Sequence, residues 1–468
     1  MAESAHGPQP QHFLFVTSPL HGHINPVRRL AARVAAANPA ARVTFSTAVS
    51  GHRLIFPTLA SPDDEVVVDG VLHVPFSDGY DHGFDPKAHD ARAYAARARA
   101  VGGETLAGVI GRLAARGRPV TRVVYTFLVG WAVGAARRHG VPAALYWIQP
   151  ATVFAVYYHY FHGHGELLAS CVTDPAGRHA GGVQLPGLPP LKPDELPTIV
   201  SATSPEQPLY AALAALREVF SDLDEHKPTV LVNTFDALEP DALHAVPQLE
   251  LVAVGPVVPD EASPASTDTL RLDDAREYME WLDARAARSV VYVSFGSLVP
   301  MGKRQEVEMR RGLEATGRPY LWVRRGGGGE KGGVSIDGAD PGVGRRRGVV
   351  VEWCDQVRVL SHPAVGCFVT HCGWNSALES IARAVPVVAV PQWTDQPTVA
   401  WLVEERAGAG VRALVDGEGV AGCAELRRCV EAVMGDGERA AEIRTRVEQW
   451  RERARDALTV NGRSQWKI

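Results

Sequence analysis

The stretch that decides the fold is residues 353–396, which read WCDQVRVLSHPAVGCFVTHCGWNSALESIARAVPVVAVPQWTDQ. It holds an apolar run typical of a buried strand, Val365–Val369, then a polar turn at 370–376 and apolar residues at helical spacing. A second short strand, 386–390, runs into a polar tip. This order predicts part of an open parallel α/β sheet, which binds ligands beyond the carboxyl ends of its strands.

The polar turn has the chemistry of a phosphate site. His371, Asn375 and Ser376 lie where the helix begins, and a helix N-terminus exposes unpaired N–H groups and the positive end of the dipole. A plainer interpretation stays open, because Ser376-x-x-Glu379 also has the pattern of a capping box. No metal site is predicted, since the cysteines near His371 lack CxxC spacing and no second His follows at three to five residues.

The whole segment resembles the donor-binding signature of the plant UDP-glycosyltransferases that act on small molecules. One position departs from it: Ala384 stands where the family usually has Gly. The positions that match at the required spacing are Trp353, Gln356, His362, Pro363, Gly366, His371 to Ser376, Glu379, Pro386, Pro391, Asp395 and Gln396.

The resemblance implies a role for each donor residue. An indole face suits a base, a carboxylate suits a ribose diol, and N–H donors suit the charge that develops on departing UDP. A terminal Gln at 396 favours glucose as the donor sugar. The implied contacts are Trp353 at the uracil, Glu379 at the ribose, Ser297, His371, Asn375 and Ser376 at the diphosphate, and Trp374, Asp395 and Gln396 at the sugar, with Gln356 as a further donor-binding residue.

The chain opens with a predicted βαβ unit. Strands are expected at 12–17 and 41–47, and a helix is expected to start with Asn25 as its cap and Pro26 at its first position. His23, in the turn between, is our candidate general base, because its ordinary pKa of about 6.5 suits proton transfer near neutral pH. A His in a turn is often surface only, but the Gly-His-x-Asn-Pro sequence matches the family's catalytic turn. His21 is the second candidate.

Position 126 departs from the family pattern. Thr126 stands where most of these enzymes carry an Asp that stabilises the protonated catalytic His, and Thr cannot neutralise that charge. Either another carboxylate, such as Asp78 or Asp81, replaces it, or the acceptor needs little help to lose its proton. This favours phenols or carboxylic acids, which are acidic, over alkyl alcohols.

The acceptor residues are expected in two stretches. The loop 76–83 lies over the acceptor pocket by analogy with the family, and the aromatic run 146–162 either forms core or lines that pocket. The resemblance is strongest to the subgroup that contains anthocyanidin 5-O-glucosyltransferases and glucose-ester-forming enzymes. The candidate acceptor residues are Phe76, Asp78, Tyr80, Trp147, Tyr157 and Phe161.

The composition sets the remaining limits. With 468 residues, of which 46% are hydrophobic and 22% charged, the chain is long enough for two domains. A formal net charge of -5 without a basic, aromatic-rich patch predicts no nucleic-acid partner, and no apolar run reaches the ~18 residues of a membrane span. Six irregularly spaced cysteines indicate a reducing compartment, so we expect a cytoplasmic monomer.

The resemblance implies a GT-B fold, with two doubly wound, Rossmann-like α/β domains facing across a cleft. The expected parts are an acceptor-binding domain at 1–255, a linker at 256–274, a UDP-sugar-binding domain at 275–450, and a C-terminal helix and tail at 451–468 that return to the first domain. Asp222-Leu223-Asp224 has the outline of a metal-binding DxD, but it ends a predicted helix, so we interpret it as surface.

The implied activity is inverting, metal-independent transfer from UDP-glucose, a co-substrate, to a small phenolic acceptor, with no other cofactor. Glucose-ester formation on a carboxylic acid is the alternative within enzymes. Two further alternatives are a nucleotide-sugar-binding protein without transferase activity and, more remotely, a nucleotide-sugar epimerase on the same fold.

Overall fold

The computed structural model describes residues 10–61, 63–85, 89–174, 181–207, 209–259, 272–296, 301–324 and 347–459. By their contacts the chain divides into two compact units. The first unit comprises 1–165, 202–233 and 241–253, and the second comprises 166–201, 234–240 and 254–468.

The first unit is built on an eight-stranded sheet, in the order β3-β4-β2-β1-β5-β6-β7-β8 among the described residues. Neighbouring strands are parallel except β3 and β4. The strands are β1 His12–Thr17, β2 Arg42–Thr47, β3 Val66–Val68, β4 Val71–His73, β5 Arg122–Tyr125, β6 Ala143–Trp147, β7 Val230–Val232 and β8 Leu251–Ala253. The helices of this unit are α1 His21–Ala37, α2 Val49–Ile55, α3 Ala91–Ala115, α4 Ala132–Arg137, α5 Ala151–His159, α7 Tyr210–His226 and α8 Pro240–His244, with the short turns η1 Phe127–Val129 and η2 Tyr160–His164. Helix α6, Gly165–Thr173, belongs to the second unit apart from its first residue.

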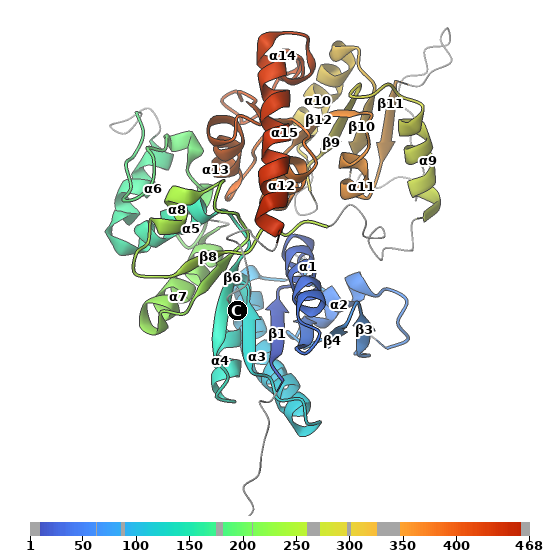
Figure 1. Ribbon diagram of the computed structural model, residues 1–468. Coiled ribbons are helices and arrows are strands. Elements are labelled where there is room, and N and C mark those ends of the chain that lie inside the picture. The colour runs from blue at the N-terminus through green and yellow to red at the C-terminus, as the bar shows by residue number, and fades with distance from the viewer. Residues whose placement is uncertain are drawn as a thin grey trace, which may run out of the picture. The chain divides into compact units, whose positions relative to one another are not determined.

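The second unit has a six-stranded, all-parallel sheet in the order β11-β10-β9-β12-β13-β14 (Figure 1). Its strands are β9 Val290–Ser294, β10 Tyr320–Val323, β11 Gly348–Val351, β12 Val365–Thr370, β13 Val387–Ala389 and β14 Gly410–Arg412. Its helices are α9 Leu272–Asp283, α10 Lys303–Thr316, α11 Gln356–Leu360, α12 Trp374–Ala382, α13 Gln396–Trp401, α14 Cys423–Met434 and α15 Glu438–Leu458, with η3 Pro193–Glu195, η4 Thr198–Ser201 and η6 Leu402–Arg406.

Each sheet reverses its strand order at one point. In the first unit the chain builds β1, β2 and β4 outward in one direction and then places β5 on the other side of β1. In the second unit it builds β9, β10 and β11 and then places β12 on the other side of β9. The loops after the strands that flank such a reversal diverge to opposite faces and leave room for a ligand. The fold therefore predicts binding residues directly after β1, β5, β9 and β12.

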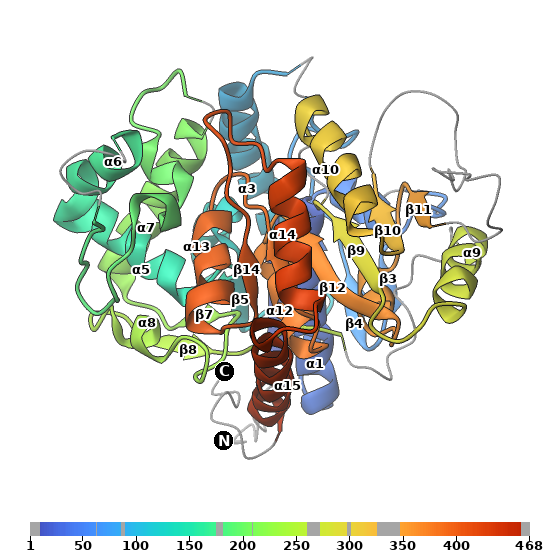
Figure 2. The ribbon, with the colours of Figure 1, turned by 90° about the horizontal axis from the view of Figure 1, so that it is seen from above.

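Helices cover both faces of the second sheet (Figure 2). Apolar residues of α10 and α14, such as Met309, Leu313 and Val430, share one buried cluster with β9 and β10, while those of α9 and α11 form another. A third cluster joins α12, α13 and α15. Because both faces of each strand are covered, the strands are continuous apolar runs without alternation, as expected for a buried parallel sheet.

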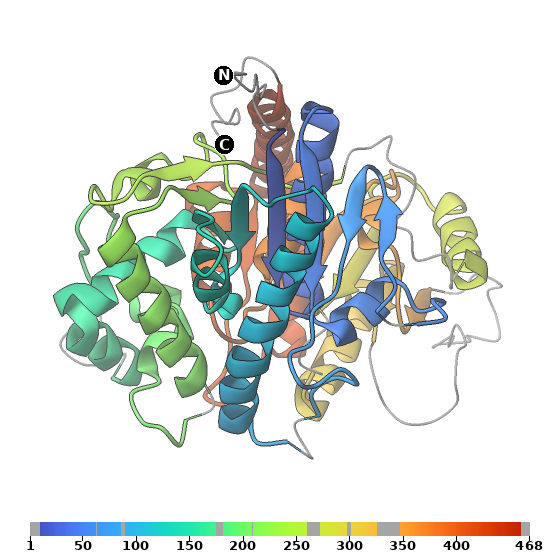
Figure 3. The ribbon, with the colours of Figure 1, turned by 90° about the horizontal axis from the view of Figure 1, so that it is seen from below.

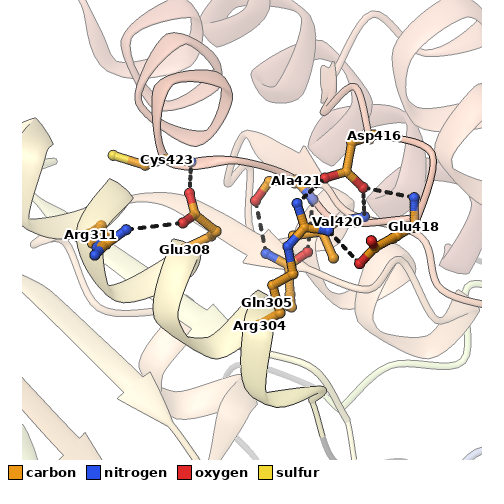
Figure 4. A network of polar contacts seen from close by, with 9 residues as sticks. All are labelled: Arg304, Gln305, Glu308, Arg311, Asp416, Glu418, Val420, Ala421 and Cys423. Carbon is orange, nitrogen blue, oxygen red and sulfur yellow. Dashed lines mark hydrogen bonds and ion pairs between the residues drawn. The ribbon is translucent and has the colours of Figure 1, made fainter.

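A polar network fastens α10 to the loop before α14 (Figure 4). The Gln305 side chain donates to the Ala421 carbonyl at 3.0 Å and accepts from the Ala421 N–H at 2.9 Å. Beside it, Arg304 contacts the carboxylates of Asp416 and Glu418 at 2.6 and 2.8 Å. The buried Gln pair holds the loop, whereas the ion pairs are exposed and contribute little stability.

Two details of the N-terminal βαβ unit differ from the prediction. Helix α1 begins at His21, so the predicted cap Asn25 and the predicted first position Pro26 lie inside the helix. The physical reason is that the Leu20 carbonyl accepts from both the His23 and Ile24 N–H groups at 2.8 Å, which carries the helical path into the turn. Figure 3 shows the N-terminal strands and helices of this unit in blue, seen from below. His23 therefore lies in the first turn of α1.

The two units defined by contacts differ from the domains expected from the sequence, which are contiguous and divided at residue 255. Phe235 and Leu238, from the segment 234–240, belong to the apolar cluster of the second unit. Phe235 lies 6.0 Å from the Trp450 ring, and the Trp450 indole N–H donates to the Ala407 carbonyl at 2.7 Å. Helix α15 also runs unbroken across residue 450 within the second unit. The predicted linker at 256–274 lies largely outside the described residues.

Gly366, in β12, is a position at which the packing of the second unit can be tested. A Cβ at this position would lie 2.4 Å from the Arg288 carbonyl oxygen and 2.5 Å from the Met434 methyl, in a strand whose register shifts at this residue. We expect Gly366→Ala to lower the free energy of unfolding by about 1–3 kcal/mol, measured by urea denaturation, because backbone must move. Gly134→Ala in α4, where a Cβ meets nothing within 4 Å, should be neutral or stabilising. Equal stability of the two variants would contradict this packing.

Candidate active site

In the second unit, the loops after β9 and β12 enclose the imidazole of His371. A Cβ on Gly296 would lie 2.8 Å from His371 Nε2, and one on Gly373 would lie 2.7 Å from it. Gly296 also has φ +76, a conformation that favours glycine. Backbone therefore approaches this ring from two sides as closely as glycine alone allows.

Burial leaves His371 neutral at pH 7. It lowers the pKa of His371 to about 4, against the opposite effect of a hydrogen bond to the Ser294 backbone. His371 Nδ1 lies 3.2 Å from the Thr370 hydroxyl oxygen. A neutral imidazole beside the first turn of α12 can donate a hydrogen bond to a phosphate oxygen, but it adds no positive charge of its own.

The side chain of Gln356, in α11, hydrogen-bonds to side chains of α12 and β9. Its Nε2 donates to the Ser376 hydroxyl at 3.0 Å and to Glu379 Oε2 at 2.8 Å, and its Oε1 accepts from the Tyr292 hydroxyl at 3.3 Å. The capping-box interpretation of Ser376 and Glu379 is wrong, because α12 begins at Trp374 and its N-cap is Gly373. Ser376 lies inside the helix, and its hydroxyl and the Glu379 carboxylate face Gln356.

The loop between β13 and α13 is closed by Gln396. Its Oε1 accepts from the backbone N–H groups of Gln392 and Trp393 at 2.9 and 3.2 Å, which leaves Nε2 to act as a donor. Asp395 is buried and accepts from the Thr394 hydroxyl at 2.9 Å. Thr394 itself has φ +55, an uncommon conformation for a β-branched residue.

The remaining predicted donor residues are placed as follows. Trp353 is partly exposed in the loop between β11 and α11, and Asn375 is partly exposed in the first turn of α12. Trp374 is only 3% exposed and packs in the apolar cluster of α12, α13 and α15, so its indole is a core group in this structure. Ser297 lies outside the described residues.

In the first unit, His23 lies in the turn after β1, in an apolar setting. Its ring centroid is 5.1 Å from that of Phe127, which follows β5. Its Nδ1 atom is buried without a hydrogen-bond partner. Burial lowers the pKa of His23 to about 3, so the ring is neutral at every ordinary pH and is a weak base.

Thr126 does not contact His23 through a hydrogen bond in this structure. It is fully buried, and its hydroxyl oxygen lies 3.2 Å from that of Thr17 at the end of β1. The predicted substitute carboxylates are engaged elsewhere. Asp78 accepts from the Tyr80 N–H at 2.8 Å and the Tyr94 hydroxyl at 3.4 Å, while Asp81 accepts from the Ser77 hydroxyl at 2.7 Å.

The predicted acceptor residues divide into buried and accessible groups. Trp147 and Tyr157 are 0% and 1% exposed, and Trp147 packs on Phe127 at 5.0 Å between ring centroids, so neither presents its ring to a small molecule here. Phe76 and Asp78 are each 3% exposed. Tyr80 and Phe161 are partly exposed, on the loop after β4 and on η2.

Sequence reasoning missed two residues of these sites. Tyr292, which braces Gln356, is hidden in the apolar strand β9, and only its phenol in a run of Val residues could have drawn attention to it. Gly296 follows the same strand, and it matters because its backbone lies close to the His371 ring, a contact that cannot be seen in a sequence. Asp222 and Asp224, interpreted as surface, lie in the last turns of α7 and pair with Arg137 and His162.

No group of three or more His, Cys, Asp or Glu in the described part of the chain is arranged to hold a metal ion. None of the helices described there combines the length and the apolar character that crossing a bilayer requires.

The two doubly wound parallel sheets, with functional side chains after the strands that flank each order reversal, define a nucleotide-binding α/β protein. Residues 256–441 match the family described as "UDP-glucoronosyl and UDP-glucosyl transferase". The chain is 41% identical to anthocyanidin 3-O-glucoside 5-O-glucosyltransferase 1 of Perilla frutescens, covering 96% of each chain. It is also 41% identical to UDP-glycosyltransferase 75C1 of Solanum lycopersicum, covering 97% of this chain and 96% of the relative.

Among solved structures, the crystal structure of Os79 from O. sativa in complex with UDP superposes with a TM-score of 0.75 at 31% identity, covering 97% of each chain. The chain therefore belongs to the plant UDP-glycosyltransferase family and has the GT-B fold. It is an enzyme of the hexosyltransferase type, and its donor co-substrate is a UDP-sugar. This result disfavours the two alternatives without transferase activity, a nucleotide-sugar-binding protein and a nucleotide-sugar epimerase.

The buried His23 predicts a stability that falls on acidification. The folded-state pKa is about 3 and the unfolded value is about 6.5, so below pH 6.5 the unfolded chain binds the extra proton and unfolding becomes easier. We expect His23→Gln to lose about 2 kcal/mol less of its free energy of unfolding than wild type between pH 7 and pH 5. Urea denaturation across this range measures it.

His21→Gln, which removes an exposed imidazole from the same helix, is the matched control. It should keep the wild-type pH dependence. If His23→Gln also keeps it, the imidazole of His23 is not held neutral by burial.

Proposed function

We propose that the protein transfers glucose from UDP-glucose to a small phenolic acceptor, with inversion at the anomeric carbon and without a metal. The main supporting observation is a group of side chains beside the first turn of α12. It consists of Gln356, Ser376, Glu379 and the His371 ring, which Gly296 and Gly373 approach closely. Relatives named for phenolic acceptors support the acceptor class: the Perilla enzyme above and phloretin 4'-O-glucosyltransferase of Malus domestica, which is 40% identical over 96% of this chain.

In the donor half of the reaction, each group binds a different part of UDP-glucose. Trp353 stacks on the uracil, and Glu379, oriented by Gln356, accepts from the ribose hydroxyls. The N–H groups at the start of α12 and the neutral His371 ring stabilise the negative charge on the departing diphosphate. Asp395 and the Nε2 of Gln396 bind sugar hydroxyls. Ser297 and Asn375 complete the diphosphate contacts.

In the acceptor half, His23 takes the proton as the acceptor oxygen attacks the anomeric carbon and the bond to UDP breaks. The products are the β-linked glucoside, UDP and a proton that passes to solvent. Because the pKa of His23 is about 3, the base is weak, and no hydrogen-bonded carboxylate strengthens it through Nδ1. A weak base is adequate only when the acceptor is itself acidic, which is why we propose a phenol and not an alkyl alcohol.

The same observation favours one second candidate, glucose-ester formation on a small carboxylic acid. A carboxylate is already ionised at pH 7 and needs no base. The unpartnered Nδ1 of His23 and the engagement of Thr126 with Thr17 are consistent with such an acceptor.

We further propose that the enzyme works as a monomer in the cytosol. All six cysteines are free, which is consistent with a reducing compartment. Crocetin glucosyltransferase of Gardenia jasminoides, 40% identical over 97% of this chain, is named as chloroplastic, so the plastid is the alternative compartment. A fluorescent fusion of the full chain in plant cells distinguishes the two.

UDP release from UDP-glucose, with EDTA present throughout, tests the function against a panel of phenols and carboxylic acids between pH 5 and pH 9. With phenols, we expect kcat/KM to rise with pH as the acceptor ionises, and His23→Ala to lower it about 10²–10⁴-fold. His23 itself, with a pKa of about 3, adds no fall in rate between pH 7 and pH 5.

Turnover of carboxylic acids alone, with a flat pH profile and an active His23→Ala, would replace the phenol by the second candidate. Loss of all activity in EDTA, restored by a divalent cation, would overturn metal independence.

The Thr126→Asp variant tests the weak base. A carboxylate here would stabilise protonated His23 and raise its pKa, so we expect turnover of weakly acidic phenols to increase several-fold while turnover of carboxylic acids stays unchanged. Thr126→Asn, which has the same size without the charge, is the control and should show no gain. Equal rates for the two variants, with both folded by circular dichroism, would mean that charge at this position does not act on His23.

A further inference from the structure

We propose that Thr198 is a positioning residue that holds the sugar-binding loop 392–396 in shape, so that the segment 194–198 helps to decide which UDP-sugar is used. This inference rests on the proposed roles of Asp395 and Gln396 in binding the donor sugar. The segment 194–198 runs from η3 to the start of η4, and it belongs to the second unit.

The segment pairs with the sugar-binding loop through two reciprocal hydrogen bonds. The Thr198 N–H donates to the Thr394 carbonyl at 2.8 Å, and the Thr394 N–H donates to the Thr198 hydroxyl oxygen at 2.8 Å. Both polar groups of the Thr394 backbone are therefore satisfied by one residue that lies 196 positions away. A side-chain acceptor at position 198 is required for the second bond, since a main-chain amide can supply only the first.

Thr394 is where the loop needs support. Its φ of +55 places a β-branched residue in the left-handed region, which costs conformational energy unless the surroundings hold it. Its hydroxyl donates to Asp395 Oδ1 at 2.9 Å. The conformation of Thr394 therefore sets the direction of the neighbouring Asp395 carboxylate.

The segment is itself anchored by two residues that precede Thr198. Thr398, in α13, donates its hydroxyl proton to the Glu195 carbonyl at 2.6 Å, and Asp194 pairs with Arg412 at the end of β14 at 3.1 Å. The buried Glu195 side chain also accepts, at 2.7 Å, from the N–H of Lys192, which lies two residues before the segment. Because the segment is held at these further points, it can keep loop 392–396 in one position.

The expected effect falls on the sugar and not on the nucleotide. Glu379, proposed to bind the ribose, lies on α12 and accepts from Gln356 of α11, which also bonds to Ser376 and Tyr292. Loosening Thr394 should therefore weaken recognition of the hexose while the affinity for UDP is kept.

The experiment compares Thr198→Val with Thr198→Ser, and uses Thr203→Val as the matched control. Valine keeps the shape of Thr198 and removes only the hydroxyl, serine keeps the hydroxyl, and Thr203 is exposed nearby. The readouts are the KM for UDP-glucose, kcat, the ratio of kcat/KM for UDP-glucose over UDP-galactose, and the Kd of UDP by calorimetry.

For Thr198→Val we expect the KM for UDP-glucose to rise about tenfold. The Thr394 N–H loses its acceptor in this variant, and such a loss costs about as much free energy as a tenfold change in affinity. The preference for UDP-glucose should fall by a similar factor, and the Kd of UDP should stay within about twofold of wild type. Thr198→Ser should recover most of the loss, and Thr203→Val should match wild type.

Three outcomes would count against the proposal. A Thr198→Val enzyme with unchanged KM and unchanged donor preference would overturn it. A KM and a UDP Kd that worsen together would show a general structural role instead, as would a loss that serine does not rescue. If wild type releases no UDP from UDP-glucose with any acceptor, the proposed function fails first, and the unchanged Kd of UDP in the variants would no longer bear on the sugar.

Discussion

The close approach of two loops to the His371 ring is the constraint on which the donor half of the molecule depends. The strand order reverses between β9 and β12, so the turns after these strands converge on one point and then lead to opposite faces of the sheet. Only glycine at 296 and 373 leaves room for the imidazole between them. The ring in turn lies beside the start of α12, whose third and sixth residues, Ser376 and Glu379, meet Gln356 from α11. Strand order, two glycines and one helix start therefore assemble the site together.

Burial has opposite consequences for the two histidines that matter. At His371 it keeps the ring neutral, which suits a donor that must bind a diphosphate and then release it as UDP. At His23 it weakens the base, because no carboxylate hydrogen-bonds to the ring and an apolar neighbour, Phe127, lies against it. On the proposed mechanism, the preference for an acidic acceptor follows from the first unit, whereas recognition of the UDP-sugar follows from the second.

Segments that are distant in sequence complete the second unit. Phe235 and Leu238 enter the cluster that α15 covers through Trp450, and residues 194–198 brace the loop that ends at Gln396. These contacts link the stretches 166–201 and 234–240 to strands and helices that follow residue 386. A local sequence signature thus depends for its geometry on residues that lie outside it, which explains how loops between elements can tune an enzyme whose signature stays the same.

The sequence by itself determined the class of fold, the donor signature and the turn that carries His23, because apolar runs, glycine turns and helix periodicity are local properties of the chain. It also placed Gln356, Ser376 and Glu379 among the candidate donor-binding residues, and the structure shows that they bond to one another. It misplaced the start of α1, because Pro26 and Asn25 imitate a helix start while the Leu20 carbonyl extends the helix to His21. Only the tertiary structure decided that Trp147 and Tyr157 are core, that Thr126 pairs with Thr17 and that Thr198 supports Thr394. Those facts depend on which distant residues meet, and burial and hydrogen-bond partners are set by that meeting and not by the local sequence.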